Sequence, residues 1–170
     1  MQQAVAMTDT KRNEFDVLLE SHRAIVFRVA RTYCRHPDDR DDLVQEIAVQ
    51  LWRAWPGYDS TRPFATWMYR IALNVAIGYV RNESHRRQHV APLDDELHDI
   101  ADDSGVDHET EQRVRLLQGF IERQAPLDRA LLLLYLDERG QRDIAEILGL
   151  SETNVSTKIG RLKQRVRAEL

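Results

Sequence analysis

The sequence predicts an all-α protein built from two small helical domains that a flexible acidic linker joins. Every clear hydrophobic periodicity in the 170 residues has helical spacing, and no segment alternates as a strand does. Proline and glycine separate the periodic segments, and one stretch rich in Asp and Glu lacks an apolar pattern. We expect a disordered tail over residues 1–10, a first domain over 11–89, the linker over 90–109 and a second domain over 110–170.

Three helices account for the first domain. The first is expected from about Lys11 to Cys34, where a stripe at helical spacing consists of Phe15, Leu18, Leu19, His22, Ile25, Val26, Val29 and Tyr33. The second can be capped by Asp38 or Asp39 and ends before Pro56. Its apolar face consists of Leu43, Val44, Ile47, Ala48, Leu51 and Trp52. The third is expected from Pro63 to about Arg81.

The second domain is also helical. A helix is expected from near Glu109 to Arg123, with its inward side formed by Val114, Leu117 and Ile121. Pro126 starts another, whose apolar residues are Leu127, Ala130, Leu131, Leu134 and Tyr135. The closing unit is a short helix over Arg142–Leu148, a left-handed Gly149, and an N-cap at Ser151. The helix that follows is lined on one face by Val155, Ile159, Leu162 and Val166.

Composition excludes several functional classes. The one cysteine, Cys34, excludes an intramolecular disulfide and a cysteine-cluster metal site, and it suits a reducing cytoplasm. No apolar run approaches the roughly 20 residues that span a bilayer, and the N-terminus lacks the order of a signal peptide. His85 and His89 have no evident third ligand. Motifs for phosphate loops, dinucleotides and nucleophiles are missing, so we expect no enzyme, metal or cofactor.

The net charge of −4 conceals an uneven distribution. Residues 1–90 carry 13 Lys and Arg against 11 Asp and Glu, whereas residues 91–111 carry nine acids and no base. Residues 112–170 carry 11 bases against eight acids. Two mildly basic domains therefore flank an acidic linker, and the overall charge does not exclude a nucleic-acid partner.

The closing unit is typical of a helix-turn-helix, because a tight glycine turn joins two helices and the second is polar and basic. Polar side chains near its start would reach base edges in the major groove, and basic ones would hold phosphates. The candidate contacts with duplex DNA are Asn154, Ser156, Thr157, Lys158, Arg161, Lys163 and Arg165. The alternative is an amphipathic hairpin with a solvated basic face.

Residues 41–87 carry the most specific pattern. The third helix presents Trp, Tyr, Arg and Asn, which suit single-stranded DNA because bases stack on rings and guanidinium groups meet phosphates. The segments 42–46 (Asp-Leu-Val-Gln-Glu), 51–53 (Leu-Trp-Arg), 58–59 (Tyr-Asp) and 64–74 (Phe-Ala-Thr-Trp-Met-Tyr-Arg-Ile-Ala-Leu-Asn) resemble the core domain of small bacterial sigma factors of the extracytoplasmic-function group. The closing unit resembles the same group's −35-reading domain, so the resemblance covers nearly the whole chain.

The resemblance implies a dissociable sigma subunit that directs core RNA polymerase to promoters and helps to melt the −10 region. It implies a polymerase-binding set of Asp42, Gln45, Glu46, Gln50 and Arg53. Contacts with the −10 strand would come from Tyr58, Arg62, Phe64, Trp67, Arg70, Asn74, Arg81, Arg86 and Arg87. Its partners would be core polymerase, promoter DNA as −10 single strand and −35 duplex, and an anti-sigma factor. Ser156 and Gly160 depart from the group's usual residues and leave the −35 base preference open.

Several alternatives stay open on the sequence. A helix-turn-helix repressor or activator, dimerised through its first domain, would bind duplex DNA without polymerase. Trp52 is expected in the core, whereas Trp67 is either core or a platform for a base, and Asn74 is either a structural residue or a base contact. The acidic linker is either a spacer or a mimic of phosphates on a basic wall.

Overall fold

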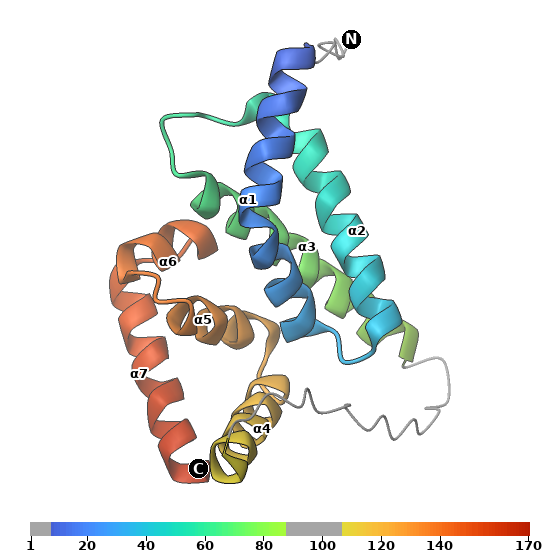
Figure 1. Cartoon of the computed structure of the whole chain (residues 1–170). Helices are drawn as coiled ribbons and strands as arrows, with labels where there is room; N and C mark the ends of the chain where they lie inside the picture. The colour runs from blue at the N-terminus through green and yellow to red at the C-terminus, as the bar shows by residue number, and fades with distance from the viewer. Residues whose placement is uncertain (1–7, 88–106) are drawn as a thin grey trace.

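The computed structural model describes residues 8–87 and 107–170, and every regular element in those ranges is a helix (Figure 1). Residues 1–7 of the predicted tail and residues 90–106 of the predicted linker lie outside the described residues. Both boundaries were predicted slightly wrongly, because α1 already begins at Asp9 and α4 at His108. The elements are α1 (Asp9–Tyr33), α2 (Pro37–Ala54), the 3₁₀ turn η1 (Trp55–Gly57), α3 (Phe64–Arg87), α4 (His108–Glu122), α5 (Pro126–Leu136), α6 (Gln141–Leu148) and α7 (Glu152–Glu169).

The first three helices form a bundle in which α1 and α2 lie side by side and α3 crosses behind them (Figure 1). The predicted stripe of α1 faces inward, because Phe15, Ile25, Val26, Val29 and Tyr33 are buried and the other members are partly buried. The α2 stripe contributes three side chains with no exposed surface, Leu43, Ile47 and Leu51. Burial of such apolar surface is what holds the bundle together.

Two details of α2 differ from the prediction. Its N-cap is His36, followed by Pro37 at the first helical position, and neither Asp38 nor Asp39 caps the helix. Both acids lie in the first turn instead, where the positive end of the helix dipole favours them. Trp52 is 39% exposed and meets Phe15 edge-on, so its assignment to the core is wrong, and Trp55 takes the buried position in η1.

The second domain packs α5, α6 and α7 together. The helix-turn-helix geometry is confirmed: Gly149 has φ +67° and ends α6, and the Ser151 hydroxyl accepts a 3.1 Å hydrogen bond from the Asn154 backbone N–H. The inward face of α4 was predicted only in part: Leu117 and Ile121 are partly buried, but Val114 is exposed and the fully buried Phe120 was not foreseen. The phase of α5 was also only partly right: Leu132 and Leu133 are buried and Tyr135 is exposed.

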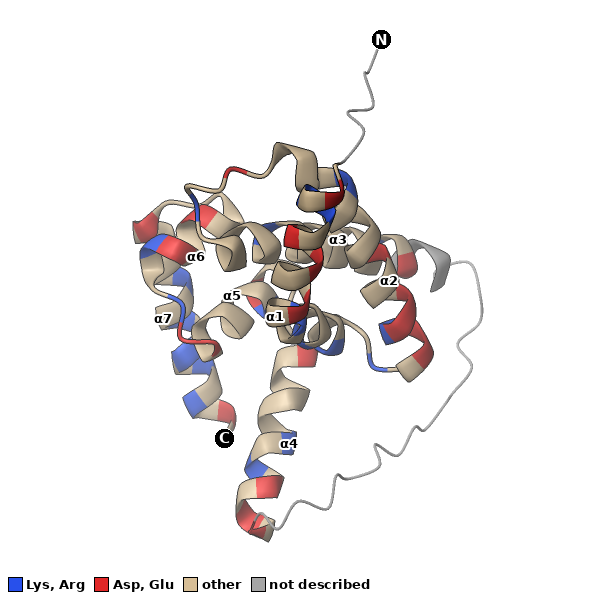
Figure 2. Cartoon of the chain, turned by 45° about the horizontal axis from the view of Figure 1, so that its top comes forward, with Lys and Arg blue, Asp and Glu red and all other residues tan. Residues whose placement is uncertain are grey.

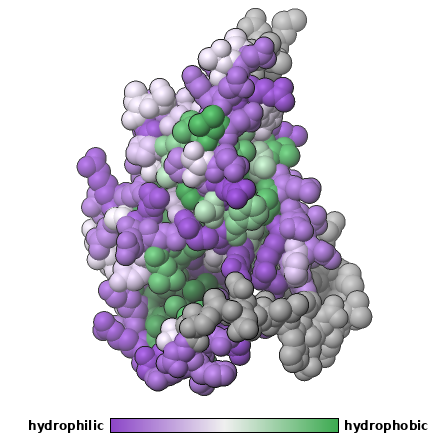
Figure 3. All heavy atoms as spheres, viewed as in Figure 1, coloured by the Kyte–Doolittle hydropathy of each residue, from purple (hydrophilic) through white to green (hydrophobic). Residues whose placement is uncertain are grey.

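The two domains lie against each other, with α4, α5 and α6 contacting α1 and α3. Figure 3 shows apolar atoms at the surface over α5, where Leu136 is half exposed. No described helix has the length and apolar character needed to cross a membrane. Within the described residues, no group of three His, Cys, Asp or Glu side chains is placed to hold a metal ion.

Candidate polymerase and nucleic-acid interfaces

A groove runs between α2 and α3 on the outer side of the first domain, and we call it the α2–α3 groove. Its α2 wall contains four of the five predicted polymerase-binding residues, and the fifth, Arg53, is exposed outside it. The groove is lined by Asp42, Gln45, Glu46, Val49, Gln50, Asn74, Val75, Gly78, Tyr79 and Asn82.

The α2 wall is polar and acidic, as the red residues along α2 in Figure 2 show. The Gln50 side-chain amide donates a 3.1 Å hydrogen bond to Glu46 one turn earlier, and both acids of the wall, Asp42 and Glu46, are exposed. Burial, together with nearby carboxylates led by Asp39, raises the pKa of Tyr79 to about 12. A partner surface that carries Lys or Arg beside apolar groups would complement this groove.

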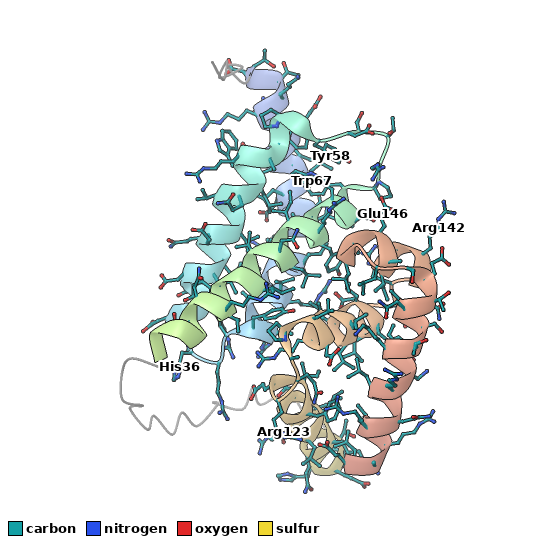
Figure 4. The ribbon with its side chains drawn as sticks, turned by 180° about the vertical axis from the view of Figure 1, so that it is seen from behind. His36, Tyr58, Trp67, Arg123, Arg142 and Glu146 are labelled. Carbon is teal, nitrogen blue, oxygen red and sulfur yellow. The ribbon has the colours of Figure 1, made fainter. Side chains whose placement is uncertain are left out.

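Four rings form a second feature, the aromatic cluster: Trp55, Tyr58, Phe64 and Trp67. Tyr58 stacks on Trp55 with 5.2 Å between ring centroids and an interplanar angle of 18°. Trp67 lies 5.0 Å from Tyr58 and is partly exposed. Figure 4 shows Tyr58 and Trp67 next to each other, where the loop enters α3.

Burial separates the members of this cluster. Phe64 is only 6% exposed and supports the other rings, so its contact with the −10 strand stays a prediction that this arrangement does not favour. Tyr58 and Trp67 retain partly exposed surface. Exposed ring faces backed by buried rings are rigid, and rigid rings stack bases with little loss of side-chain entropy.

The loop before α3 is held in one conformation by its own side chains. The Asp59 carboxylate accepts bonds from the Thr61 hydroxyl and backbone N–H, and these bonds hold its pKa below the ordinary value. The Tyr58 hydroxyl donates a 2.8 Å bond to the Arg62 carbonyl oxygen. The loop therefore fixes Arg62 beside the aromatic cluster, with most of its side chain exposed.

The predicted −10 residues continue along α3. Trp67 and Asn74 are two turns apart and lie on one line of the helix, which passes from the aromatic cluster into the α2–α3 groove. Asn74, Arg70 and Arg81 are exposed, so Asn74 is no core residue. Arg86 and Arg87 lie in the last turn of α3, and their side chains are outside the described ones.

The outer face of α7 is the third feature. Asn154, Thr157 and Arg161 are exposed and lie opposite the buried Val155, Ile159 and Leu162. Figure 2 shows the basic residues gathered along this helix. Asn154, Thr157 and Arg161 follow one another at helical spacing, and Gln164 is the next residue on the same face. Gln164 is exposed, and the sequence prediction omitted it.

The other predicted −35 residues lie on the flanks of α7. The Lys163 ammonium is 5.0 Å from the centre of the Tyr135 ring, and the Arg165 guanidinium is 5.8 Å from that of Phe120. Both cations therefore rest on α5 and α4 beside the outer face. Lys158 is partly buried, and Ser156 is exposed on the flank that it shares with Lys163.

Two family descriptions match this chain in the order of its domains. Residues 18–86 match Sigma-70 region 2, and residues 116–166 match Sigma-70, region 4. The first range contains the α2–α3 groove and the aromatic cluster, and the second contains the helix-turn-helix.

Curated relatives agree. The chain is 31% identical over 155 residues to a probable RNA polymerase sigma factor, RfaY, of Xanthomonas campestris pv. campestris, and this match covers 85% of the chain but only 37% of RfaY. It is 27% identical to the RNA polymerase sigma factor CnrH of Cupriavidus metallidurans, covering 92% of the chain and 86% of CnrH. It is 24% identical to the ECF RNA polymerase sigma factor SigM of Mycobacterium tuberculosis, covering 91% and 76%.

Two solved structures share the fold. CnrH in complex with the cytosolic domain of CnrY superposes with a TM-score of 0.66 at 22% identity, over 92% of this chain and 87% of CnrH. The sigma factor RpoE of Bartonella quintana, in complex with the anti-sigma factor NepR, superposes with a TM-score of 0.69 at 15% identity, over 95% and 96%. Sequence pattern, fold and relatives agree, and the chain belongs to the extracytoplasmic-function (ECF) group of RNA polymerase sigma factors.

Proposed function

We propose that this protein directs core RNA polymerase to specific promoters and helps to melt their −10 region. In this proposal the first domain binds polymerase and captures the melted −10 strand, and the second domain reads the −35 duplex. The chemistry of RNA synthesis belongs to the polymerase, so the chain itself is no enzyme. Its place of action is the cytoplasm, because that is where a bacterial polymerase meets its promoters.

The observation that carries the proposal is the continuity of one surface along α3. Trp67 borders the aromatic cluster, and Asn74, on the same line of the helix, borders the α2–α3 groove with Gln45 and Glu46. A rigid helix that joins a protein-binding groove to a base-stacking surface would hold a captured strand at a fixed distance from the polymerase. Such coupling is what promoter opening by a sigma subunit requires.

The −35 reader would be the outer face of α7. Asn154, Thr157 and Arg161 are exposed there with no large apolar neighbour on the same line. Asn and Arg side chains can each form two hydrogen bonds with one base, which is how sequence is read in the major groove. The flanking cations would contact phosphates on either side.

Regulation by an anti-sigma factor belongs to the same proposal. RpoE of Bartonella quintana, which shares the fold, was solved with the anti-sigma factor NepR. An anti-sigma factor for this chain would compete with polymerase for the α2–α3 groove, because four of the five proposed polymerase-binding residues line it.

The test is reconstitution with core polymerase. The purified chain should co-elute with core polymerase and confer transcription from a subset of fragments in a promoter library. A chain that leaves polymerase unbound, yet binds a specific duplex with nanomolar affinity on its own, would instead be a repressor or activator of the helix-turn-helix class.

A further inference from the structure

The buried side of the aromatic cluster is anchored to the start of α1. Trp55 is only 7% exposed, and its indole N–H donates a 3.0 Å hydrogen bond to the backbone carbonyl oxygen of Lys11. The Trp55 ring also lies 5.3 Å from the Phe15 ring, measured between centroids. The indole therefore cannot rotate without losing both a directional bond and a ring contact.

The 3₁₀ turn η1 places Tyr58 directly on this anchored ring. In a 3₁₀ turn, side chains three residues apart eclipse each other. The Tyr58 backbone N–H closes such a turn, because it donates a 2.9 Å bond to the Trp55 carbonyl oxygen. Pro56 lies inside the turn, where its ring fixes φ. The short segment Trp-Pro-Gly-Tyr thus builds the stack of Tyr58 on Trp55 by itself.

The cluster covers only one face of Tyr58. Two rings on opposite faces of Tyr58 would be at least roughly 7 Å apart, because each stacking step takes about 3.4 Å. Trp67 and Phe64 lie only 6.1 Å and 6.3 Å from Trp55, so both rings border the stack at its edge. The Tyr58 face that points away from Trp55 therefore carries no ring of the cluster, and Tyr58 is partly exposed.

The space between Tyr58 and Trp67 is too narrow for a base. Their centroids are 5.0 Å apart with an interplanar angle of 51°, whereas a base stacked between two rings needs roughly 7 Å. Figure 4 shows these two side chains next to each other. A base can therefore stack on the outer face of Tyr58, with Trp67 at its edge, but it cannot be sandwiched between the two rings.

We propose that Trp55 is a positioning residue for strand capture, which holds Tyr58 as a one-sided platform on which a single base of the −10 strand stacks. The inference deepens the proposed function and rests on it for the identity of the strand. A ring that is fixed from behind loses little conformational freedom when a base stacks on it. Trp55 acts through Tyr58, and it is absent from the −10 contacts predicted from the sequence.

The other restraint on Tyr58 is of a different kind. Its hydroxyl donates a 2.8 Å bond to the Arg62 carbonyl oxygen, which fixes the tip of the ring. A ring held only at its tip can still rotate about its long axis, whereas the Trp55 stack fixes the plane of the ring. Loss of Trp55 should therefore leave the loop in place and release the plane of the platform.

The first experiment measures the Tyr58 ring in the free full-length chain. Labelling with ¹³C-tyrosine gives ring signals for the five tyrosines, and Tyr58→Phe assigns those of Tyr58. The indole beneath the ring should shift the Tyr58 ring protons upfield. We expect Trp55→Leu to remove this shift and Trp55→Phe, which keeps a ring there, to retain most of it. An unchanged Tyr58 signal in Trp55→Leu would overturn the inference.

The second experiment measures strand capture by the chain assembled on core polymerase. The probe is a promoter fragment whose −10 strand is already single, so that no melting is needed. We expect Trp55→Leu to weaken binding of this fragment about fivefold or more, because the contribution of a stacked base depends on its platform. Trp55→Phe should lose less. The salt dependence should not change, since stacking neutralises no phosphate.

Leu43→Val is the matched control for stability. Leu43 is fully buried in α2, about three turns before Trp55, and none of the rings of the aromatic cluster lies at that end of the helix. Both variants are compared at a temperature at which circular dichroism shows them folded. A loss of strand capture in Leu43→Val as large as that in Trp55→Leu would mean that Trp55 acts only through the stability of the domain, and would overturn the inference.

A double-mutant cycle tests whether Trp55 acts through Tyr58. In the Tyr58→Leu background, Trp55→Leu should cause no further loss of capture, because the platform is already missing. Losses of equal size with and without Tyr58 would show that Trp55 has a separate role, and the inference would be wrong.

The two experiments also separate this inference from the proposed function. A wild type that supports transcription, with capture unchanged in Trp55→Leu, would retain the function and refute the role of Trp55. A wild type that never captures the strand on polymerase would refute the proposed function, and the strand role of Trp55 with it, even where the Tyr58 signal confirms the stack.

Discussion

At the scale of single residues, Asn74 is the side chain whose surroundings say most about promoter opening. It is exposed, it lines the α2–α3 groove, and it shares a line of α3 with Trp67. We expect Asn74→Ala to slow promoter opening while closed complexes still form, because only the melted strand offers an unstacked base. Loss of one base contact typically costs about 1–3 kcal/mol.

Asn82 supplies the matched control for that substitution, since it is also an exposed asparagine of α3 that lines the groove. Permanganate reactivity of the −10 thymines measures opening, and filter binding measures the closed complex. If Asn74→Ala instead weakens binding to core polymerase, the residue belongs to the polymerase contact and its assignment to the −10 strand is wrong.

Base reading by α7 is a prediction about Asn154 and Arg161. Both are exposed on the outer face, so neither substitution by Ala should unfold the domain. At least one should relax the preference at a defined −35 base, because a two-bond base contact discriminates by about 1–3 kcal/mol. Lys163→Ala, in contrast, should lower affinity about equally for all sequences.

A promoter library scored with each of these three variants makes the comparison. An unchanged base profile for both Asn154→Ala and Arg161→Ala would place the reading face of α7 elsewhere, for instance on the flank that carries Ser156.

The turn of the helix-turn-helix gives a prediction about stability. Gly149 has φ +67°, a conformation that costs a residue with a Cβ roughly 1–2 kcal/mol, so Gly149→Ala should destabilise the domain by about that amount. Gly160 lies in the interior of α7 with no atom near its missing Cβ. Gly160→Ala should therefore stabilise by about 0.5–1 kcal/mol.

Urea unfolding followed by circular dichroism measures both glycine variants. Opposite signs for the two are the expected result, and a loss of equal size at both positions would mean that side-chain bulk, rather than backbone conformation, decides the effect.

At the scale of elements, α2 is a helix with one buried face and one face for a partner. Gln45 and Glu46 lie off the buried stripe and are exposed on the groove wall. Replacing both with Lys should abolish binding to core polymerase and leave the melting temperature nearly unchanged, because surface substitutions typically change stability by less than about 0.5 kcal/mol.

The control for α2 is the pair Glu111→Lys and Gln112→Lys on α4, which makes the same change of charge away from the groove. Co-elution with core polymerase is the measurement. A Gln45, Glu46 variant that unfolds would show that these side chains are structural.

The helices themselves follow from local sequence, and this is why they could be predicted. Periodicity located α1, α2, α5 and α7. Pro126 marked the start of α5, Gly149 the end of α6 and Ser151 the start of α7. The buried face of a helix was harder to predict where apolar residues lie on two sides of it. In α4, Leu116 and Val114 are exposed while Phe120 is buried, because the helices that contact α4, which include α1 and α5, cover only one side of it.

The candidate site was predictable only in part. Residue types and the resemblance located Tyr58, Trp67 and the α2 acids, but the sequence could not tell which rings are buried. Trp55 and Phe64 form the inner side of the aromatic cluster because η1 and the start of α3 fold onto α1. That arrangement depends on contacts between elements that periodicity does not contain.

At the scale of the whole molecule, the side-chain contacts between the two domains are the feature furthest from sequence reasoning. Its partners are far apart in the chain, such as Tyr69 and Asp137, and each is an ordinary solvated residue in its own helix. These residues pair because the two domains pack against each other. The pattern of charges along either domain alone does not specify which residues will meet.

The packing of the two domains against each other should respond to alkaline pH through Tyr69, whose hydroxyl donates to Asp137. Burial, and then the bond to Asp137, raise the pKa of its hydroxyl, although Arg28 acts in the opposite direction and Arg139 faces its ring. A raised pKa means that the neutral hydroxyl stabilises the closed arrangement. This stabilisation is complete below the ordinary tyrosine pKa of about 10 and is lost as the pH rises through the higher value in the closed arrangement.

We therefore expect the radius of gyration of the wild type to increase above a pH of about 10, while circular dichroism still reports folded helices. Tyr69→Phe lacks the titrating group, so its radius should already be larger at neutral pH and should rise less with alkali. The Tyr33 hydroxyl donates to the Pro126 carbonyl between the same two domains and its pKa is also raised by burial, so Tyr33→Phe serves as the second comparison. An alkaline expansion of the same size in the wild type and in Tyr69→Phe would show that Tyr69 does not control the closing of the two domains.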